Sequence, residues 1–324
     1  MKTLEKHIKD NEFSKNYLLC GEEDYLRKLY KDKLKSAIIG DNLTMNYSYY
    51  EGKNIDPSEV IDEANTLPFF SDRKLIIIEN SEFFSVQNNL ADNLSGFPES
   101  TIIIFIEEKV DKRTKLYKQI KKLGTVTDFK KLSERNLEIF IASLLKKDKM
   151  RITTRNVAYL LEKIGPNMVN IVSEVEKLIS YAYGREEITK ADIDAVCTEQ
   201  TEGKIFQMID AITNKDIDTA LDLYYDLLEL NESPNSILFL LSRHFKILIQ
   251  TKDLYKRGVG NNEIARKAGV NSYFVNKYIS QGRKFSMNTL ENNLSLCNTT
   301  EADIKTGNQQ AQLGVEVLII QFAN

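Results

Sequence analysis

The sequence of 324 residues is poor in the residue types that most often build metal and catalytic sites. It contains no tryptophan, two histidines and three cysteines. Cys20, Cys197 and Cys297 lie far apart and none belongs to a C-x-x-C pair, which argues against a disulfide framework and against a cysteine-based zinc site. We therefore expect reduced, buried thiols, no metal and no cofactor.

Long hydrophobic runs are also missing. The longest apolar segments, TIIIFI and LIII, have the length of strands and are far too short to cross a bilayer. The first residues, MKTLEKHIKDNEF, contain no apolar core of the length found in signal peptides. These features predict a cytoplasmic protein with no membrane partner.

The chain has only a small net charge. The net charge is −3, with 42% hydrophobic and 28% charged residues, the composition of an ordinary globular protein with two or three domains. This balance argues against nucleic-acid binding through overall charge, but not against a local basic patch. Basic residues do concentrate between 109 and 155, where they form either a solvated helix face or a surface for nucleic acid or an acidic partner.

Strand-like and helix-like segments alternate in the first 130 residues or so. Continuous apolar strands without alternation are typical of a sheet covered on both faces, and strand–helix alternation indicates parallel strands joined by right-handed crossovers. One expected helix begins with Asp56 as its N-cap and Pro57 at its first position. The sequence thus predicts an α/β domain over residues 1–132, with strands at 16–21, 45–52, 74–80, 101–108 and 125–129 and helices at 23–38, 56–67, 85–97 and 112–124.

No strand is expected after residue 132. Apolar residues recur at helical spacing in residues 133–203, which predicts a small helical domain, with Ser133 as a plausible cap of its first helix. A second block of helices fills residues 204–324. Internal repeats are absent, so a solenoid is not expected.

No catalytic or nucleotide site emerges from the motifs. A phosphate-binding turn after the first strand would need G-x-x-x-x-G-K-[ST], but the turn reads LLCGEEDYLRK. Glu22, Glu23 and Asp24 stand where phosphates would lie and would repel them. The two histidines, His7 and His244, are far apart, and His244 lies on an apolar helix as a core or interface residue. We expect no intrinsic catalysis.

Residues 261–285 resemble a helix-turn-helix with its turn at Gly269. A recognition helix would carry polar and basic side chains at its N-terminal turns, whereas this one carries Ser272, Tyr273, Phe274 and Val275. DNA binding of the helix-turn-helix type remains the alternative function, but helical packing is favoured.

The segment NTLPFFSDRK, residues 65–74, contains two adjacent phenylalanines. Pro68 should end the preceding helix, and Ser71 and Asp72 mark a turn before the next strand. Phe69 and Phe70 are therefore either buried at the start of a strand or exposed at a corner as an anchor for a partner.

Four segments together resemble the delta-subunit family of bacterial DNA polymerase III, which opens the sliding clamp in the replicative clamp loader. They are YLLCGEEDYL, ANTLPFFSDRKLIIIEN, TEGKIFQMIDAITNKD and IARKAGVNSYFVNKYISQGRKF, and the resemblance covers essentially the whole chain. It implies a AAA+-like α/β domain without a working ATP site, a helical lid domain and a C-terminal helical collar domain, at residues 1–132, 133–203 and 204–324.

The resemblance also implies partners and a binding site. Leu67, Phe69 and Phe70 would insert into a hydrophobic pocket of the beta sliding clamp, although the first residue of the phenylalanine pair is often leucine in the family. The other expected partners are the ATP-binding clamp-loader subunits, the delta-prime subunit, and primed DNA within the assembly.

Overall fold

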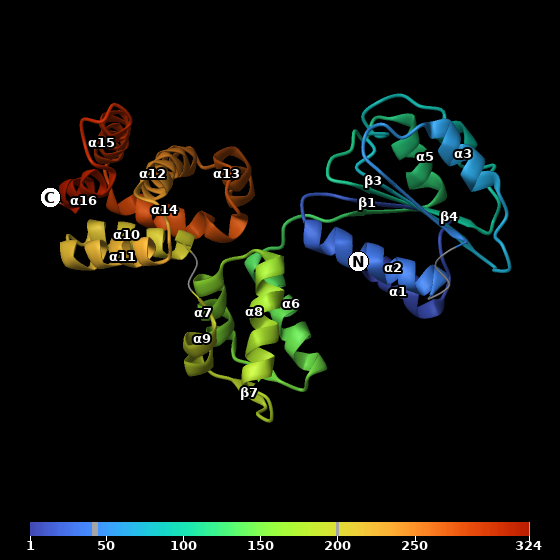
Figure 1. The fold of residues 1–324 in the computed structure, drawn as a ribbon, viewed down its shortest axis with the longest axis horizontal. Coiled ribbons are helices and arrows are strands. Elements are labelled where there is room, and N and C mark those ends of the chain that lie inside the picture. Colours follow the sequence, from blue (N-terminus) through green and yellow to red (C-terminus); the bar gives the residue numbers. More distant parts are fainter. Residues whose placement is uncertain (41–44, 199–200, 324) are drawn as a thin grey trace. The chain divides into compact units, whose positions relative to one another are not determined.

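A computed structural model of the chain describes residues 1–40, 45–198 and 201–323. The chain forms two compact units, Met1–Lys131 and Leu132–Asn324, and each is described by itself (Figure 1). Among the described residues, no helix is both long and apolar enough to cross a membrane. The expected separation of the second unit into a lid domain and a collar domain stays a prediction.

The first unit is built on one five-stranded sheet with the strand order β2-β3-β4-β1-β5. Every neighbouring pair of strands is parallel, because each connection passes through a crossover rather than a hairpin. The predicted α/β fold with a parallel sheet is confirmed. Its strands are β1 (Asn16–Cys20), β2 (Tyr47–Glu51), β3 (Lys74–Glu79), β4 (Thr101–Glu107) and β5 (Thr125–Asp128).

Helices cover both faces of this sheet. In Figure 1, α1 (Lys2–Asp10) and α2 (Asp24–Ile39) lie on one face, and α3 (Pro57–Asn65) and α5 (Lys115–Leu123) lie on the other. The short α4 (Leu90–Asn93) packs with α3 and α5. The central strands β3 and β4 are buried along almost their whole length, as their uninterrupted apolar runs predicted.

One predicted helix of this unit was wrong, and one observed helix had not been predicted. Residues 85–97 form only the single turn of α4. Asn88 explains part of the difference, because its Nδ2 donates to the carbonyl oxygens of Phe83 and Val86 at 2.8 and 3.1 Å and so stabilises a non-helical turn. Helix α1 was not expected from its polar sequence. It is held by the fully buried Leu4 and by a hydrogen bond from Tyr30 to Glu5 at 2.8 Å.

The second unit is mostly helical, as expected. A two-stranded parallel ladder, β6 (Arg151–Ile152) and β7 (Glu187–Ile188), contradicts the prediction of no strand after residue 132, since two-residue strands give no periodic signal. The position of Ser133 as N-cap is right, but its side chain makes no capping bond. The helices are α6 (Glu134–Lys147), α7 (Thr154–Ile164), α8 (Met168–Tyr181), α9 (Lys190–Val196), α10 (Thr201–Thr213), α11 (Ile217–Glu229), α12 (Pro234–Lys256), α13 (Asn261–Ala268), α14 (Val275–Lys284), α15 (Met287–Lys305) and α16 (Ala311–Ala323), with the 3₁₀ turn η1 (Ser272–Phe274) before α14.

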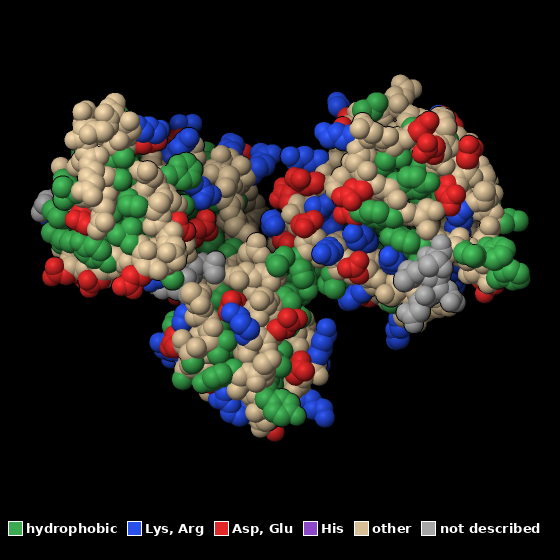
Figure 2. Space-filling view, in the orientation of Figure 1, with side chains coloured by type: hydrophobic (Ala, Val, Ile, Leu, Met, Phe, Trp, Pro, Cys, Tyr) green, Lys and Arg blue, Asp and Glu red, His purple; other side chains and the backbone are tan. Residues whose placement is uncertain are grey.

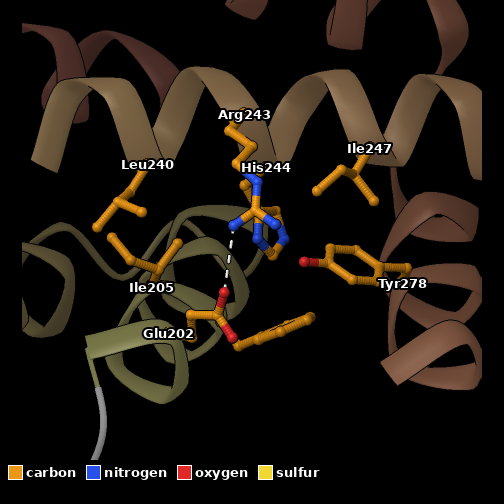
Figure 3. Close-up of a pocket in the computed structure, with 8 residues that line it drawn as sticks. Glu202, Ile205, Leu240, Arg243, His244, Ile247 and Tyr278 are labelled. Atoms are coloured by element: carbon orange, nitrogen blue, oxygen red, sulfur yellow. Dashed lines mark hydrogen bonds and ion pairs between the residues drawn. The ribbon is translucent and has the colours of Figure 1, made fainter. Parts of the chain in front are cut away.

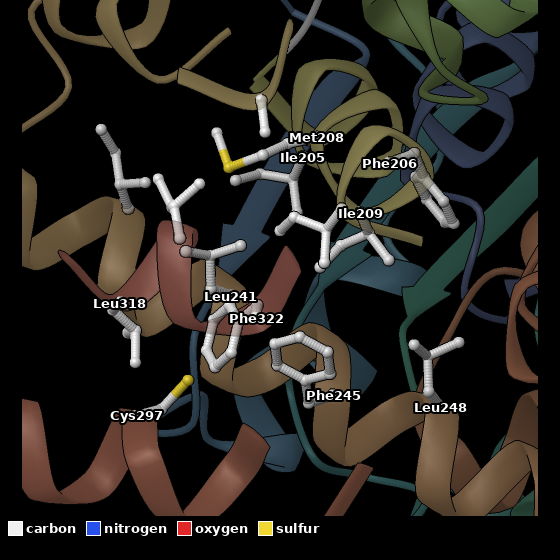
Figure 4. Packing of buried hydrophobic residues seen from close by; sticks show 14 of the residues in the cluster. Ile205, Phe206, Met208, Ile209, Leu241, Phe245, Leu248, Cys297, Leu318 and Phe322 are labelled. Carbon is white, nitrogen blue, oxygen red and sulfur yellow. The ribbon is translucent and has the colours of Figure 1, made fainter. Parts of the chain in front are cut away.

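A large apolar core of the second unit lies between helices α10, α11, α12, α14, α15 and α16. Figure 4 shows how Phe245 and Leu241 from α12 face Phe322 and Leu318 from α16. Cys297 of α15 is buried in the same cluster. Like Cys20 and Cys197 it is buried and free, as the sequence predicted for these thiols.

His244 of α12 is fully buried beside this core. Its Nε2 lies 2.8 Å from Oε1 of Gln281, whose Nε2 donates to the carbonyl oxygen of Phe206 at 2.9 Å. Because the Gln281 Oε1 can only accept, the imidazole donates from Nε2. Its ring packs against Phe206 and against Tyr278 (Figure 3). The cavity at this site measures about 10 Å³, at most room for one water molecule, so His244 is a core residue.

This environment predicts a pH-dependent stability. Burial lowers the pKa of His244 from 6.5 to about 4, and the hydrogen bond to Gln281 opposes it only in part. Between these two values the unfolded chain binds a proton that the folded chain does not, so the free energy of unfolding falls as the pH falls. The loss from this residue between pH 7 and pH 5 should be about 2 kcal/mol. Urea unfolding of the parent and of His244→Gln measures it, and an equal loss in both proteins would contradict it.

Candidate functional site

The segment with the adjacent phenylalanines follows helix α3, whose two ends are set by side chains. Asp56 accepts a hydrogen bond from the backbone N–H of Ser58 at 2.8 Å, with Pro57 at the first helical position, as predicted. At the other end, the backbone N–H and the hydroxyl of Thr66 both donate to the carbonyl oxygen of Glu63, at 3.2 and 2.7 Å. The helix therefore stops at Asn65, three residues before Pro68.

Residues 66–73 form the loop between α3 and β3. Leu67 is 75% exposed, Phe69 56% and Phe70 95%, and β3 begins only at Lys74. The two phenylalanines are therefore exposed at a corner and do not start a buried strand. We call Leu67, Phe69 and Phe70 the apolar tip. Figure 2 shows hydrophobic side chains projecting at the edge of the first unit where Figure 1 draws this loop.

The apolar tip has a defined internal geometry. The rings of Phe69 and Phe70 meet edge to face, with centroids 4.4 Å apart and an interplanar angle of 81°. Phe70 has a φ of 48°, in the left-handed region that a bulky side chain rarely adopts. Because the Phe70 ring is almost fully exposed, its burial does not offset the free-energy cost of this backbone conformation. This points to a functional role for the residue and not a role in stability.

The base of the loop is closed by Lys74, whose side chain is almost completely buried. Its ammonium group lies 2.7 Å from the carboxylate of Glu63 and donates to the Glu63 carbonyl oxygen at 2.8 Å and to the Thr66 hydroxyl. Burial by itself would raise the pKa of Glu63, but hydrogen bonds from Lys74 and Ser48 outweigh it and hold that pKa below its usual value. The end of α3 and the start of β3 are thus tied together.

Two further side chains, Arg73 of the loop and Asn46 outside it, tie the loop to other parts of the unit. Arg73 donates to the side-chain and backbone oxygens of Asn11 at 2.9 and 3.0 Å and lies over the ring of Phe13. Asn46, just before β2, makes two hydrogen bonds to the backbone of Phe69. The sequence analysis identified the apolar tip but missed Asn46, Arg73 and Lys74, because these contacts join residues that are remote in the chain.

The turn after β1, the expected place for a phosphate, is occupied by protein contacts. The N–H groups of Gly21 and Glu23 donate to the carbonyl oxygens of Glu108 and Phe129 at 3.3 and 2.9 Å. Glu23 is buried and pairs with Lys131 at 3.2 Å. Gly21 has a φ of 113°, and a Cβ there would lie 2.4 Å from the Phe129 carbonyl oxygen. The amides of Gly21 and Glu23, which a phosphate would use, are already hydrogen-bonded to protein carbonyl groups. The N-terminus of α2 also carries the carboxylates of Glu22, Glu23 and Asp24.

The helix-turn-helix-like segment forms α13, a left-handed turn at Gly269, and α14. Phe274 and Val275, at the start of α14, are buried in apolar clusters of the second unit. Lys277 pairs with Glu162 and Lys284 with Asp210, each at 3.0 Å. Two residues of the N-terminal turn that would read bases are thus buried and both lysines are ion-paired, which weighs against base recognition by α14.

The basic stretch from 109 to 155 divides between the two units. In the first unit Lys112, Lys115 and Lys131 are engaged with Asp128, Asp92 and Glu23. Lys118, Lys121 and Lys122 are exposed on α5. In the parts of the chain that the structure describes, no group of three histidine, cysteine or acidic residues is arranged to hold a metal ion. The apolar tip is therefore the strongest candidate site.

Comparison with known proteins agrees with this organisation. The family model for "DNA polymerase III, delta subunit" matches residues 17–130, and the model for the C-terminal domain of the same subunit matches residues 202–322. The DNA polymerase III subunit delta of Bacillus subtilis is 28% identical over 98% of this chain and 95% of its own length. A probable delta subunit of Aquifex aeolicus is 24% identical over 80% of this chain and 77% of its own.

One solved structure is similar to this chain over nearly its full length. The Bacillus subtilis DNA clamp loader delta protein superposes with a TM-score of 0.80 and 26% identity, covering 99% of both chains. Two models of one family match separate parts of the sequence, and the fold agrees over the full length. The chain belongs to the DNA polymerase III delta-subunit family.

Proposed function

We propose that the chain is the clamp-opening subunit of a replicative clamp loader and that it binds a beta sliding clamp through the apolar tip. The observation that carries the proposal is the pair of exposed aromatic rings on a loop braced at its base, in a chain of the delta-subunit family. Exposed aromatic side chains on a rigid element suit insertion into an apolar pocket, where they become the centre of the interface.

Clamp opening follows from where the binding energy is used. A ligand shifts an equilibrium between two states only by its different affinity for them. The apolar tip therefore opens the clamp if the pocket of the clamp binds Phe69 and Phe70 more tightly when the clamp interface is open than when it is closed. The chain supplies this binding energy, and the ATP-binding subunits and the delta-prime subunit of the loader decide when the apolar tip is presented to a clamp on primed DNA.

This role requires no nucleotide chemistry from the chain itself. The occupied amides of Gly21 and Glu23 and the carboxylates of Glu22 and Asp24 support a β1–α2 turn that neither binds nor hydrolyses ATP. Helix-turn-helix DNA binding, the alternative from the sequence, has no specific observation in its favour, because the start of α14 is buried.

The first prediction concerns the apolar tip. Phe69→Ala/Phe70→Ala should weaken binding to the organism's own beta clamp by about 100-fold or more, since truncated anchors of this kind cost about 2 kcal/mol or more each. Surface plasmon resonance with immobilised clamp measures this change. Its matched control is Tyr181→Ala/Tyr183→Ala, which removes two rings that are 57% and 89% exposed in the second unit and should bind like the parent. Equal binding by all three proteins would refute the site.

A second prediction separates the stability of the loop from its function. Phe70→Asn should leave the free energy of unfolding unchanged or raise it by up to about 1 kcal/mol, because asparagine tolerates a positive φ and the lost ring is almost fully exposed. The same variant should lose clamp binding. Phe69→Asn is the control, since Phe69 is not among the residues with positive φ, and it should lower stability. Chemical unfolding measures both, and a clear loss of stability in Phe70→Asn would contradict the argument.

A third prediction concerns the β1–α2 turn. ATP with magnesium should not shift the thermal unfolding of the isolated chain, because the amides of Gly21 and Glu23 are already hydrogen-bonded and the carboxylates of Glu22 and Asp24 would repel an anion. Binding would be easy to detect, since a ligand at about 100 times its dissociation constant adds about 2.7 kcal/mol to the free energy of unfolding. A saturable shift with ATP, absent with magnesium alone, would overturn the proposed lack of nucleotide binding.

A further inference from the structure

We propose that Asn46 is the positioning residue of the apolar tip: its side-chain amide holds the backbone of Phe69, so that Phe69 and Phe70 meet the clamp in a preset arrangement. This inference rests on the proposed function and names a residue that lies outside the loop itself. The binding contact would come from Leu67, Phe69 and Phe70, and Asn46 would act through them.

The contact between Asn46 and Phe69 uses both ends of an amide. The backbone N–H of Phe69 donates to Oδ1 of Asn46 at 2.6 Å, and Nδ2 of Asn46 donates to the carbonyl oxygen of Phe69 at 2.8 Å. The side chain thus pairs with Phe69 as a neighbouring strand would. An aspartate can supply only acceptors once it is ionised, and an alanine supplies neither group. The two bonds join residues that are 23 positions apart in the chain.

Asn46 is itself firmly held. The residue is 5% exposed, and its carbonyl oxygen accepts a hydrogen bond from the backbone N–H of Leu75 at 2.8 Å. It directly precedes β2, whose first residue Tyr47 is in register with Leu75 of β3. A continuous path of hydrogen bonds therefore runs from the parallel sheet through Asn46 to the backbone that carries the exposed rings.

The unusual backbone conformation of Phe70 explains why the loop needs the hydrogen bonds from Asn46. Phe70 has a φ of 48° while its ring is 95% exposed, so burial of that ring does not maintain the conformation. A residue in a sparsely populated backbone region keeps it only when its surroundings impose it. Asn46 fixes the residue before Phe70, and Pro68 has a restricted φ on the other side. Without Asn46, the loop would have to be ordered at the moment of binding, which costs affinity.

The first experiment observes the loop without any partner. Because the sequence contains no tryptophan, Phe70→Trp introduces a single indole at the apolar tip. Adding Asn46→Ala should increase the fast local component in its time-resolved fluorescence anisotropy. Asn46→Asp, which keeps the shape of the side chain but not its donor, should act in the same direction and serves if the alanine variant does not fold.

Asn88 provides a matched control in the same unit. Its side chain also binds backbone on both sides, donating to Phe83 and Val86 and accepting from Leu90, but in the loop between β3 and α4. Asn88→Ala therefore removes a comparable contact away from the apolar tip. It should leave the indole anisotropy unchanged, which separates positioning from a general loss of stability.

The second experiment measures clamp binding with the phenylalanines intact. Asn46→Ala should weaken binding by about tenfold, the effect expected when one or two residues must be ordered on binding; Asn88→Ala should bind like the parent. Unchanged anisotropy and unchanged affinity in Asn46→Ala would overturn the positioning role. Failure of the parent itself to bind clamp would instead refute the proposed function, while the anisotropy would still decide whether Asn46 orders the loop.

Discussion

An exposed apolar side chain contributes nothing to its own placement, and this constraint governs how the loop between α3 and β3 is built. Phe70 is 95% exposed, so the hydrophobic effect that orders core residues does not act on it in the free protein. Its orientation must come from the backbone, and the backbone must be held by contacts lower in the loop. Lys74, Arg73 and Asn46 provide these contacts from β3, from its N-terminal approach and from the segment before β2.

All three contacts are polar, which suits their position at the rim of a sheet. Buried amides and ammonium groups must be hydrogen-bonded or they destabilise the fold. Lys74 meets this requirement by joining the end of α3 to the start of β3. The hydrogen bonds that stabilise the α/β unit therefore also hold the base of the loop, and the apolar tip is supported without being buried. A rigid apolar group loses less conformational freedom on binding.

The parallel sheet also explains what the unit does not offer. The carboxyl ends of parallel strands are the usual place for ligands in α/β domains. Here the turn after β1 is closed against Phe129, and its acidic residues give the start of α2 a negative character. The apolar tip, the proposed contact site, lies instead at the opposite ends of the strands, in the loop that leads into β3. Under the proposed function, this unit carries a protein contact on a loop of its sheet and leaves the usual nucleotide position closed.

The sequence by itself determined the parallel α/β unit, the helical remainder, the start of α3 and the corner that holds Phe69 and Phe70. These features depend on local patterns: uninterrupted apolar strands, the Asp56-Pro57 cap, and breakers on both sides of the aromatic pair. Local pattern left open whether the pair was buried or exposed, and only the family resemblance favoured exposure. The sequence mispredicted α4, where local hydrogen bonds of Asn88 stabilise a turn, and it missed α1, which long-range contacts hold. Only the tertiary structure decided the contact of Asn46 with Phe69 and the closure of the β1–α2 turn. Both depend on hydrogen bonds between residues that are distant in the chain, and such pairing leaves no periodic trace in one sequence.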